Sequence, residues 1–394
     1  MNNNNEKPFE QLRKKDGSSF SDDTIRSWYI ARSYVLKALS EKEREHPFSP
    51  DSKEHLHVVL TSDDSRMLYI ARQVALSAHY INFNEESEDK ESPCRTKISI
   101  ISEDVSIKQR LSKEEYLCNL PKYCKFVVEH KVDNRIEHEI YNQNSYIDIE
   151  IHIVSKSNKP IKGKNEIMIE ISSDDVDNYF NHMLEGDEEV FTIDTRKAFY
   201  ASKMYNIGEA IDNLPAENIH DTKRYTMALN VFQYERLTEK PQRLFENSIK
   251  EGEQHKLKEN LSNVFCSDCF ELRAHAIKSL NRDNLKDITI LWERYNEALS
   301  MSEHARWVVE KLIMGYRPFN DEEHHQNEIL RAQFKSKNKL KKYQNSLKRN
   351  DEKLAHIDLC SYRDLRRINP DNLKYDSFLM LAIPKILDKV RTKR

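Results

Sequence analysis

The sequence predicts a protein with an α/β sheet in its first half and helices in its second half. Runs rich in β-branched residues recur between 55 and 175, as expected for strands. From "DDVDNYFNHML" onward, apolar residues instead repeat at helical spacing. A chain of 394 residues is long enough for two or three domains, each with its own core. We expect a polar segment and helix (1–50), an α/β domain (51–180), a helical connector (181–285) and a helical domain (286–394).

The first half opens with a strand–helix–strand order. After a helix over 22–45, "HLHVVLT" (55–61) predicts a strand and "SDDS" (62–65) a turn. A long amphipathic segment (66–83) and the strand-like "RTKISIIS" (95–102) complete a βαβ unit.

The rest of this half continues the sheet. A helical stretch near 103–119 is followed by three strands at "KFVVEHKV", "YIDIEIHIVS" and "NEIMIEIS". We expect some antiparallel pairing at an edge of this sheet.

Composition excludes several classes of protein. The chain has 66 acidic and 63 basic residues, so no overall field favours polyanions, and nucleic-acid binding is not expected. No run approaches the roughly 18 to 20 apolar residues that cross a bilayer, and the first residues lack a signal-peptide pattern. Six cysteines in this length suit a reducing compartment. We expect a cytoplasmic protein without membrane insertion.

Glycine is scarce, with only six in the chain. Loops that cradle phosphates need two or three glycines within about eight residues, because backbone amides must approach the phosphates closely. No such cluster occurs, which argues against a nucleoside triphosphate or dinucleotide loop.

One helical segment, "SEHARWVVEKLIMGYRP", places a tryptophan among charges. Gly315 predicts the end of this helix, and Pro318 prevents its continuation. Trp307 lies off the apolar stripe, near His304 and Lys311 on the helical wheel. It either packs under another element or forms one wall of a site for a planar ligand. The apolar stripe itself comprises Met301, Ala305, Val308, Val309 and Leu312.

This segment resembles the prokaryotic form of the ryanodine-receptor repeat (RyR) domain. The resemblance covers roughly 290–390 and includes "KLAHIDLCSYRDLRRINPDNLKYDSFLMLAIPKIL" after a charged insertion. Ile357 and Ser361 stand where the family usually has proline. The resemblance implies a helical domain found in nucleotide-signalling and antiviral defence settings in bacteria.

The resemblance and the residue chemistry together give a set of candidate ligand-binding residues. Aromatic rings would stack on a base, and basic side chains would meet phosphates or ribose oxygens. The candidates are His304, Arg306, Trp307, Lys311, Tyr316, Arg317, His356, Tyr362 and Arg363.

The upstream half resembles the Rossmann-like, NAD-binding module of potassium-uptake regulators. The strand, turn, helix and second strand are in place, but the turn has no glycine of the phosphate-binding fingerprint. It has Asp63 and Asp64 where a pyrophosphate would lie, and carboxylates repel a diphosphate. We therefore expect a degenerate Rossmann-like domain and no NAD; no other cofactor is indicated.

Other patterns leave alternatives open. Cys266 and Cys269 have thiol-pair spacing without a second pair, so we expect packing rather than zinc. Asp63, Asp64, Glu103 and Asp104 would support a Mg²⁺-dependent enzyme acting on nucleotides. The charged insertion 320–353 predicts an exposed helical arm or a loop. Within it, 331–349 is a basic stripe that we expect to be an exposed helix face, with contact to RNA or to a partner as the alternative.

The leading expectation is a non-enzymatic sensor. It would bind a nucleotide-derived small molecule of the ADP-ribose or cyclic-nucleotide class through the RyR-like domain and signal to a partner or to its own oligomer. The alternatives are a metal-dependent nucleotide-processing enzyme and a non-catalytic adaptor that docks a protein through 320–353.

Overall fold

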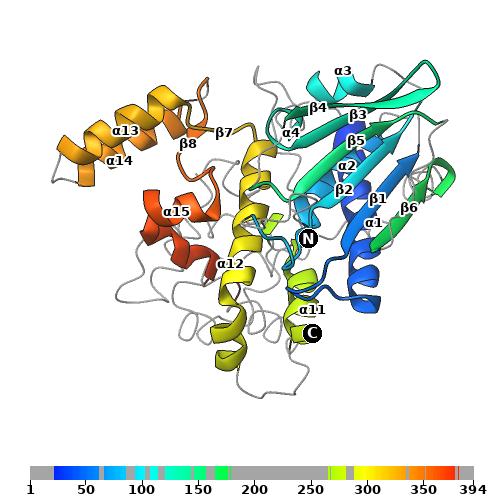
Figure 1. Ribbon diagram of the computed structural model, residues 1–394, viewed down its shortest axis with the longest axis horizontal. Coiled ribbons are helices and arrows are strands. Elements are labelled where there is room, and N and C mark those ends of the chain that lie inside the picture. The colour runs from blue at the N-terminus through cyan, green and yellow to red at the C-terminus, as the bar shows by residue number, and fades with distance from the viewer. Residues whose placement is uncertain are drawn as a thin grey trace, which may run out of the picture.

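The structure contains a sheet with its covering helices and, beside it, a second group of helices (Figure 1). It is a computed structural model. The residues that it describes are 22–61, 66–85, 94–102, 107–113, 120–142, 146–156, 165–175, 265–266, 268–280, 288–333, 337–350 and 352–377, together with 178 and 380.

The first half of the chain forms a mixed α/β sheet of six strands. Their order across the sheet is β4-β3-β5-β2-β1-β6. All neighbouring pairs are parallel except β3 and β4, so the expected antiparallel edge is confirmed. The strands are β1 (His55–Thr61), β2 (Thr96–Ile101), β3 (Lys125–Val132), β4 (Arg135–Asn142), β5 (Ile149–Val154) and β6 (Glu166–Ser172).

Strand β4 was not predicted from the sequence. Its residues, "RIEHEIYN", are mostly charged or polar, and it lies at the open edge of the sheet. Asp133 and Asn134 connect it to β3, both with positive φ, 47° and 62°. A two-residue turn with two positive φ angles is typical of a tight hairpin, and Asp and Asn tolerate that conformation. The turn residues were therefore the available signal.

Helices cover one face of the sheet, where the strands present almost only aliphatic side chains. Helix α2 (Met67–Ser77) packs on β1 and β2, and α1 (Asp22–Glu45) packs on α2. Helix α11 (Phe270–Leu280) packs on α1. The predicted long segment 66–83 is helical only to Ser77. Two short helices, α3 (Ile107–Lys113) and α4 (Leu120–Tyr123), lie in the connections.

Helix α12 (Ile288–Ile313) joins the same hydrophobic core as the sheet. It contacts α2, and Val308, Val309 and Leu312 are at most 1% exposed. Its predicted apolar stripe is therefore confirmed as buried. These side chains belong to one core cluster with Val58 and Ile98 of the sheet. The sheet and α12 thus share one interior.

Gly315 ends α12 as predicted. Its φ is +89°, a conformation that residues with a Cβ rarely adopt. The amide of Tyr316 donates to the Lys311 carbonyl (2.9 Å), and that of Gly315 donates to the Leu312 carbonyl (3.0 Å). These bonds satisfy carbonyls at the helix end and turn the chain away from the helix axis.

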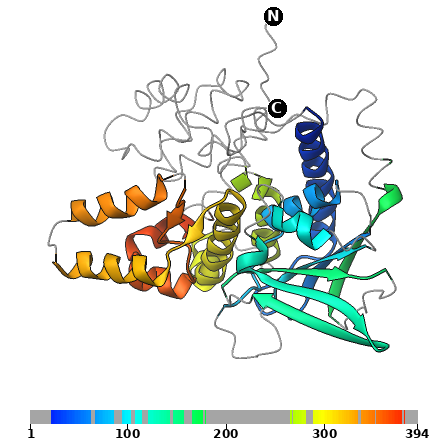
Figure 2. The same ribbon diagram turned by 90° about the horizontal axis from the view of Figure 1, so that it is seen from above.

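The charged insertion forms a helical hairpin, which we call the arm: α13 (Asp321–Gln333) and α14 (Lys337–Lys348). It projects from the side of α12 that faces away from the sheet (Figure 2). Asn320 and Glu323 cap α13 reciprocally, each side chain accepting from the other residue's backbone amide. At the base of the arm, β7 (Arg317–Pro318) pairs with β8 (Ala355–His356). Helix α15 (Tyr362–Ile368) and a 3₁₀ turn (Pro370–Asn372) follow.

Candidate functional site

Five aromatic or imidazole rings lie together where α12, the β7–β8 pair and α15 meet. We call His304, Trp307, Tyr316, His356 and Tyr362 the ring cluster. The Trp307 ring meets His356 edge-on at 5.0 Å between centroids and stacks on His304 at 5.9 Å. His304 also lies 5.8 Å from Tyr362, and His356 lies 6.3 Å from Tyr316. All five were candidate residues, and the fold brings them together.

Lys311 places a positive charge over the two half-buried rings of this cluster. Its Nζ lies 5.8 Å from the centroid of Trp307 and 5.9 Å from that of Tyr316. Within this range an ammonium is attracted to the electron-rich ring face. The same amine pairs with buried Glu310 at 2.8 Å. Lys311, Trp307 and Tyr316 together therefore form the partly exposed surface of the ring cluster, in which the Lys311 side chain is 12% exposed and lies over the two rings.

His304 is a buried, charged member of the ring cluster. Its Nε2 donates to the Cys360 carbonyl (3.0 Å), and its Nδ1 lies 3.5 Å from Asp376. Burial alone would lower the pKa of His304, but the hydrogen bonds and the charge of Asp376 outweigh it and raise that pKa well above its usual value. His304 thus links α12 to the segments on either side of α15.

His356 has the opposite protonation state. It is buried, and this burial, helped by the charges of Lys348, Lys311 and His304, holds its pKa well below the usual value. Its Nδ1 accepts from the backbone amide of Asp358 at 3.2 Å. A cationic and a neutral imidazole therefore contact the same indole.

Arg306 does not lie at this surface. It is 2% exposed, and its guanidinium bonds to Glu303 (2.8 Å) and Glu310 (2.6 Å), which are also buried. The triad reverses the expectation that Arg306 would meet a ligand's anionic groups, because two carboxylates already surround the guanidinium. A helix with 3.6 residues per turn places positions 303, 306 and 310 on one face.

The other two arginines of the candidate set differ in their contacts. Arg317 donates to both carboxylate oxygens of Glu323, each at 2.8 Å, and so fixes the start of the arm. Arg363 is exposed. Its backbone amide, with that of Tyr362, donates to Glu85 at 2.8 and 2.9 Å.

Two carboxylates of this region were not identified as site residues from the sequence. Glu85 caps the amino end of α15 from 277 positions away in the chain, and local sequence carries no signal for such a contact. Asp376 lies far from His304 in the sequence, and only the fold shows that the two side chains pair.

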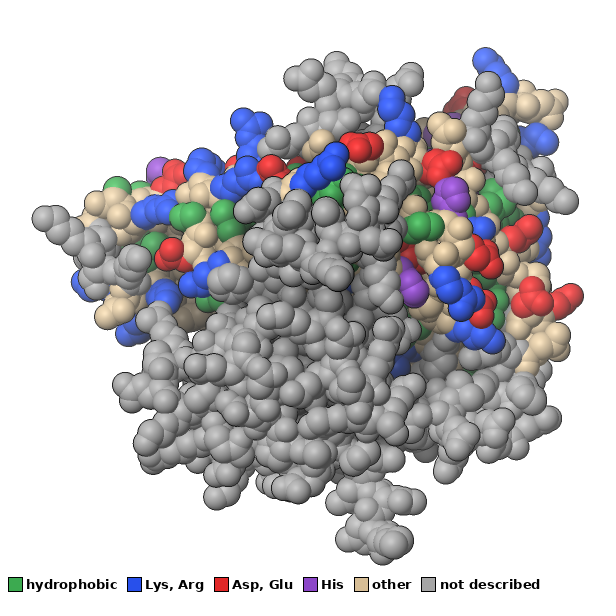
Figure 3. Space-filling model, turned by 90° about the horizontal axis from the view of Figure 1, so that it is seen from below, with side chains coloured by type: hydrophobic (Ala, Val, Ile, Leu, Met, Phe, Trp, Pro, Cys, Tyr) green, Lys and Arg blue, Asp and Glu red, His purple; other side chains and the backbone are tan. Residues whose placement is uncertain are grey.

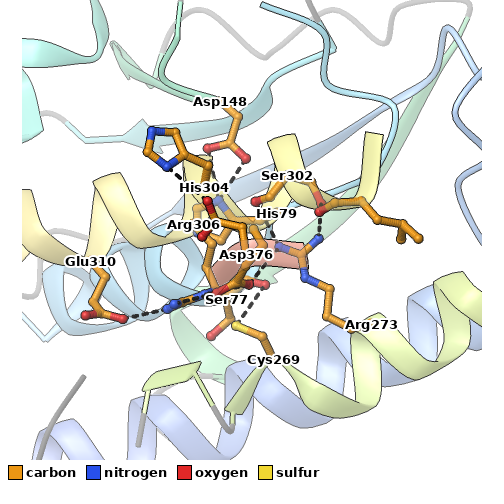
Figure 4. A network of polar contacts seen from close by, with 12 residues as sticks. Ser77, His79, Asp148, Cys269, Arg273, Ser302, His304, Arg306, Glu310 and Asp376 are labelled. Atoms are coloured by element: carbon orange, nitrogen blue, oxygen red, sulfur yellow. Dashed lines mark hydrogen bonds and ion pairs between the residues drawn. The ribbon is translucent and has the colours of Figure 1, made fainter. Parts of the chain in front are cut away.

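A polar network connects the helices to the sheet (Figure 4). His79 bonds to Asp148 (2.8 Å), directly before β5, and the Cys269 thiol lies 3.5 Å from the Leu76 carbonyl. Arg273 of α11 donates to the Ser302 hydroxyl and carbonyl of α12. Cys266 and Cys269 are buried free thiols, as expected for packing residues, and burial raises the pKa of both.

The ring cluster lies toward the amino edge of the parallel strands. Glu85 lies between α2 and β2, and Asp148 directly precedes β5, so both mark that edge. Ligands of open α/β sheets usually bind at the opposite, carboxyl edge. Asp63, Asp64, Glu103 and Asp104, considered above as support for a Mg²⁺-dependent enzyme, lie outside the described residues.

The geometry of the described part of the chain shows no group of three or more His, Cys, Asp or Glu side chains arranged to hold a metal ion. Within the same ranges, no helix is long and apolar enough to cross a membrane. Comparison with known proteins adds no relative: no family model, curated protein or solved structure matches the chain.

Proposed function

We propose that this protein is a sensor that binds a nucleotide-derived small molecule, of the ADP-ribose or cyclic-nucleotide class, at Trp307, Lys311 and Tyr316. The site belongs to a RyR-like helical region, 286–394, that follows a degenerate Rossmann-like sheet domain. A base would stack on the half-buried rings, and the Lys311 ammonium would meet a phosphate.

The observation that carries this proposal is the position of the Lys311 amine over both rings. A planar, anionic ligand needs both features at one place, because ring stacking alone does not select for charge. Arg306 and Arg317 contribute indirectly in this reading. They hold α12 and the arm in place through Glu303, Glu310 and Glu323.

The ring cluster is connected to the sheet domain through Tyr362 of α15. Tyr362 belongs to the cluster and opens α15, and its backbone amide bonds to Glu85 at the sheet edge. A ligand that shifts Tyr362 would weaken this cap, since the bonds depend on the orientation of the α15 amides. Signalling to a partner or to a second copy would pass through this junction.

The test is a thermal-shift screen of the full chain against NAD, ADP-ribose, cyclic ADP-ribose, cyclic dinucleotides and S-adenosylmethionine, each with and without Mg²⁺. A ligand that binds only the native state raises the melting temperature by mass action. We expect a shift with one of these compounds that is lost in Lys311→Met. This variant keeps the aliphatic packing and removes only the charge, while Glu310 keeps Arg306 as its partner.

Lys131→Met is the matched control, because Lys131 is exposed on β3. It should leave the shift unchanged. Trp307→Ala should also abolish the shift, and its own melting temperature reports whether the ring is needed for folding. A ligand shift that survives in both Lys311→Met and Trp307→Ala would place the binding site elsewhere.

A further inference from the structure

The β3–β4 hairpin holds most of the exposed apolar side chains in the part of the chain that the structure describes. Five large apolar side chains are exposed there, and four of them lie on this hairpin: Val132, Ile136, Ile140 and Tyr141. Figure 2 shows the hairpin at the lower right, extending past the described helices. Apolar side chains that are exposed singly need no explanation, but a local concentration marks a surface that another chain covers.

Strand β4 also presents a row of backbone hydrogen-bonding groups at the edge of the sheet. Among the described residues, no strand pairs with its outer side. Val132 and Arg135 flank the two-residue turn, where paired residues exchange both backbone hydrogen bonds. Such pairs alternate along an antiparallel ladder, so Ile136, His138 and Ile140 direct their amides and carbonyls outward. The edge is therefore open to the addition of a further strand.

The outward residues of β4 are arranged symmetrically about His138. If a second copy of β4 pairs antiparallel with His138 opposite itself, Ile136 of each copy lies opposite Ile140 of the other. All four isoleucines then lie on one face of the joined sheet, because directly opposite residues share a face. In the same register, the outward amides and carbonyls of the two copies meet each other. One two-fold axis produces both matches, and two-fold dimers are the commonest homo-oligomers.

The charged side chains of β4 lie on its other face, where attraction and repulsion both occur. Arg135 of each copy would lie diagonally opposite Glu139 of the other, an attractive contact. Glu137 would lie directly opposite that same carboxylate, and this repulsion weakens the pairing without displacing the isoleucines. Figure 3 shows acidic and basic side chains mixed over the sheet side of the molecule, at the right of the view, so no single-sign field keeps two copies apart.

From these observations we infer that two copies of this chain associate through β4, in an antiparallel register centred on His138. The joined strands form one continuous sheet across both copies. A different protein would not require the symmetry that the sequence "IEHEI" shows. The contact is a single short strand pair, so we expect a weak dimer with a Kd of about 10 to 100 µM. This inference does not depend on the proposed ligand site.

Sedimentation velocity of the full chain from about 1 to 200 µM measures the association, and we expect the dimer to appear as concentration rises. The variant His138→Pro removes the outward amide at the centre of the pairing but no bond to β3, so it should weaken the dimer at least tenfold. His138→Ala is the matched control, because it changes the same side chain and keeps the amide. It should stay within about threefold of the unchanged chain.

The double variant Ile136→Lys/Ile140→Lys tests the apolar face without a proline, in case His138→Pro unfolds the hairpin. It should also weaken the dimer at least tenfold, because it places four ammonium groups where the isoleucines would meet. Tyr375→Lys, at the fifth exposed apolar side chain, should leave the dimer unchanged. A chain that stays monomeric up to about 200 µM would overturn the inference and leave the edge to a different protein. A dimer that persists in both the proline and the double-lysine variants would overturn it by placing the interface elsewhere.

Discussion

His57 is a single residue whose burial makes the stability of the fold depend on pH. It lies on β1, fully buried, 2.8 Å from the Ser99 hydroxyl and 3.5 Å from Glu166. Burial, with the charge of Lys97, lowers its pKa from 6.5 to about 4, against the opposing effect of Glu166. The folded protein therefore keeps this imidazole neutral in a range where the unfolded chain protonates it.

The sign of the pH effect follows from that difference. Between pH 6.5 and pH 4 the unfolded chain binds a proton that the folded protein does not, so the free energy of unfolding falls on acidification, by up to about 3 kcal/mol. Urea unfolding at pH 7 and pH 4.5 measures this fall in the free energy of unfolding. His57→Gln should lose part of this pH dependence, and an identical dependence in the variant would assign the effect to other groups.

Replacing Arg306 distinguishes a structural role of this buried charge from a ligand-binding role. Arg306→Ala leaves Glu303 and Glu310 buried without their main partner, which we expect to destabilise the fold by about 3 to 5 kcal/mol. Urea unfolding measures this loss, with Arg363→Ala as an exposed control expected to change stability by less than about 0.5 kcal/mol. A stable Arg306→Ala protein that has lost ligand binding would contradict this structural role.

At the scale of an element, the end of α12 sets the geometry of the candidate site. Tyr316 follows Gly315 directly, and the positive φ of that glycine turns the chain so that Tyr316 lies under Lys311. A Cβ at this position would meet only the Leu354 side chain, at 3.7 Å, an ordinary contact. The cost of a larger residue is therefore conformational and not steric.

Gly315→Ala should destabilise the protein by about 1 to 2 kcal/mol, the cost of a left-handed conformation for a residue with a Cβ. Gly315→Asn should cost less, because asparagine tolerates that conformation. Thermal unfolding of the two variants checks the order. Equal stability of Gly315→Ala and the unchanged chain would contradict the observed φ.

Elements with strong periodicity were predicted from the sequence, and those set by distant contacts were not. The helix over 22–45 and the strand over 55–61 match α1 and β1 in their limits. Strand β4 was not predicted because an edge strand exposes charged residues, so its sequence lacks apolar alternation. In the site, the stripe of α12 predicted its buried apolar residues, but His304, Arg306 and Glu310 are also buried and lie outside that stripe. The pairing of Arg306 and the cap from Glu85 depend on packing that no local pattern encodes.

At the scale of the whole molecule, the shared core makes the sheet and α12 dependent on each other. Arg32 of α1 pairs with Asp268, next to α11, across 236 positions of the chain, and the core cluster runs from β1 to α12. Elements that share one interior generally unfold together. The described sheet and α12 should therefore behave as one cooperative unit.

Leu312→Ala tests this dependence, because Leu312 is 1% exposed within the shared core. We expect a loss of about 2 to 5 kcal/mol, typical of a buried leucine. Hydrogen exchange should show faster opening in β1 and β2 as well as in α12. Acceleration confined to α12 would mean that the helix and the sheet unfold independently.

The cap that Glu85 places on α15 also constrains how the protein is made. Glu85 and Tyr362 are 277 positions apart, and a ribosome adds about 5 to 20 residues per second. The backbone amides that Glu85 binds are therefore synthesised about 14 to 55 s after Glu85 itself. During that time the apolar side chains of α2 that α12 later covers are open to other chains, as is common for nascent proteins with long-range contacts. The equilibrium stability of the folded chain does not report this exposure during synthesis.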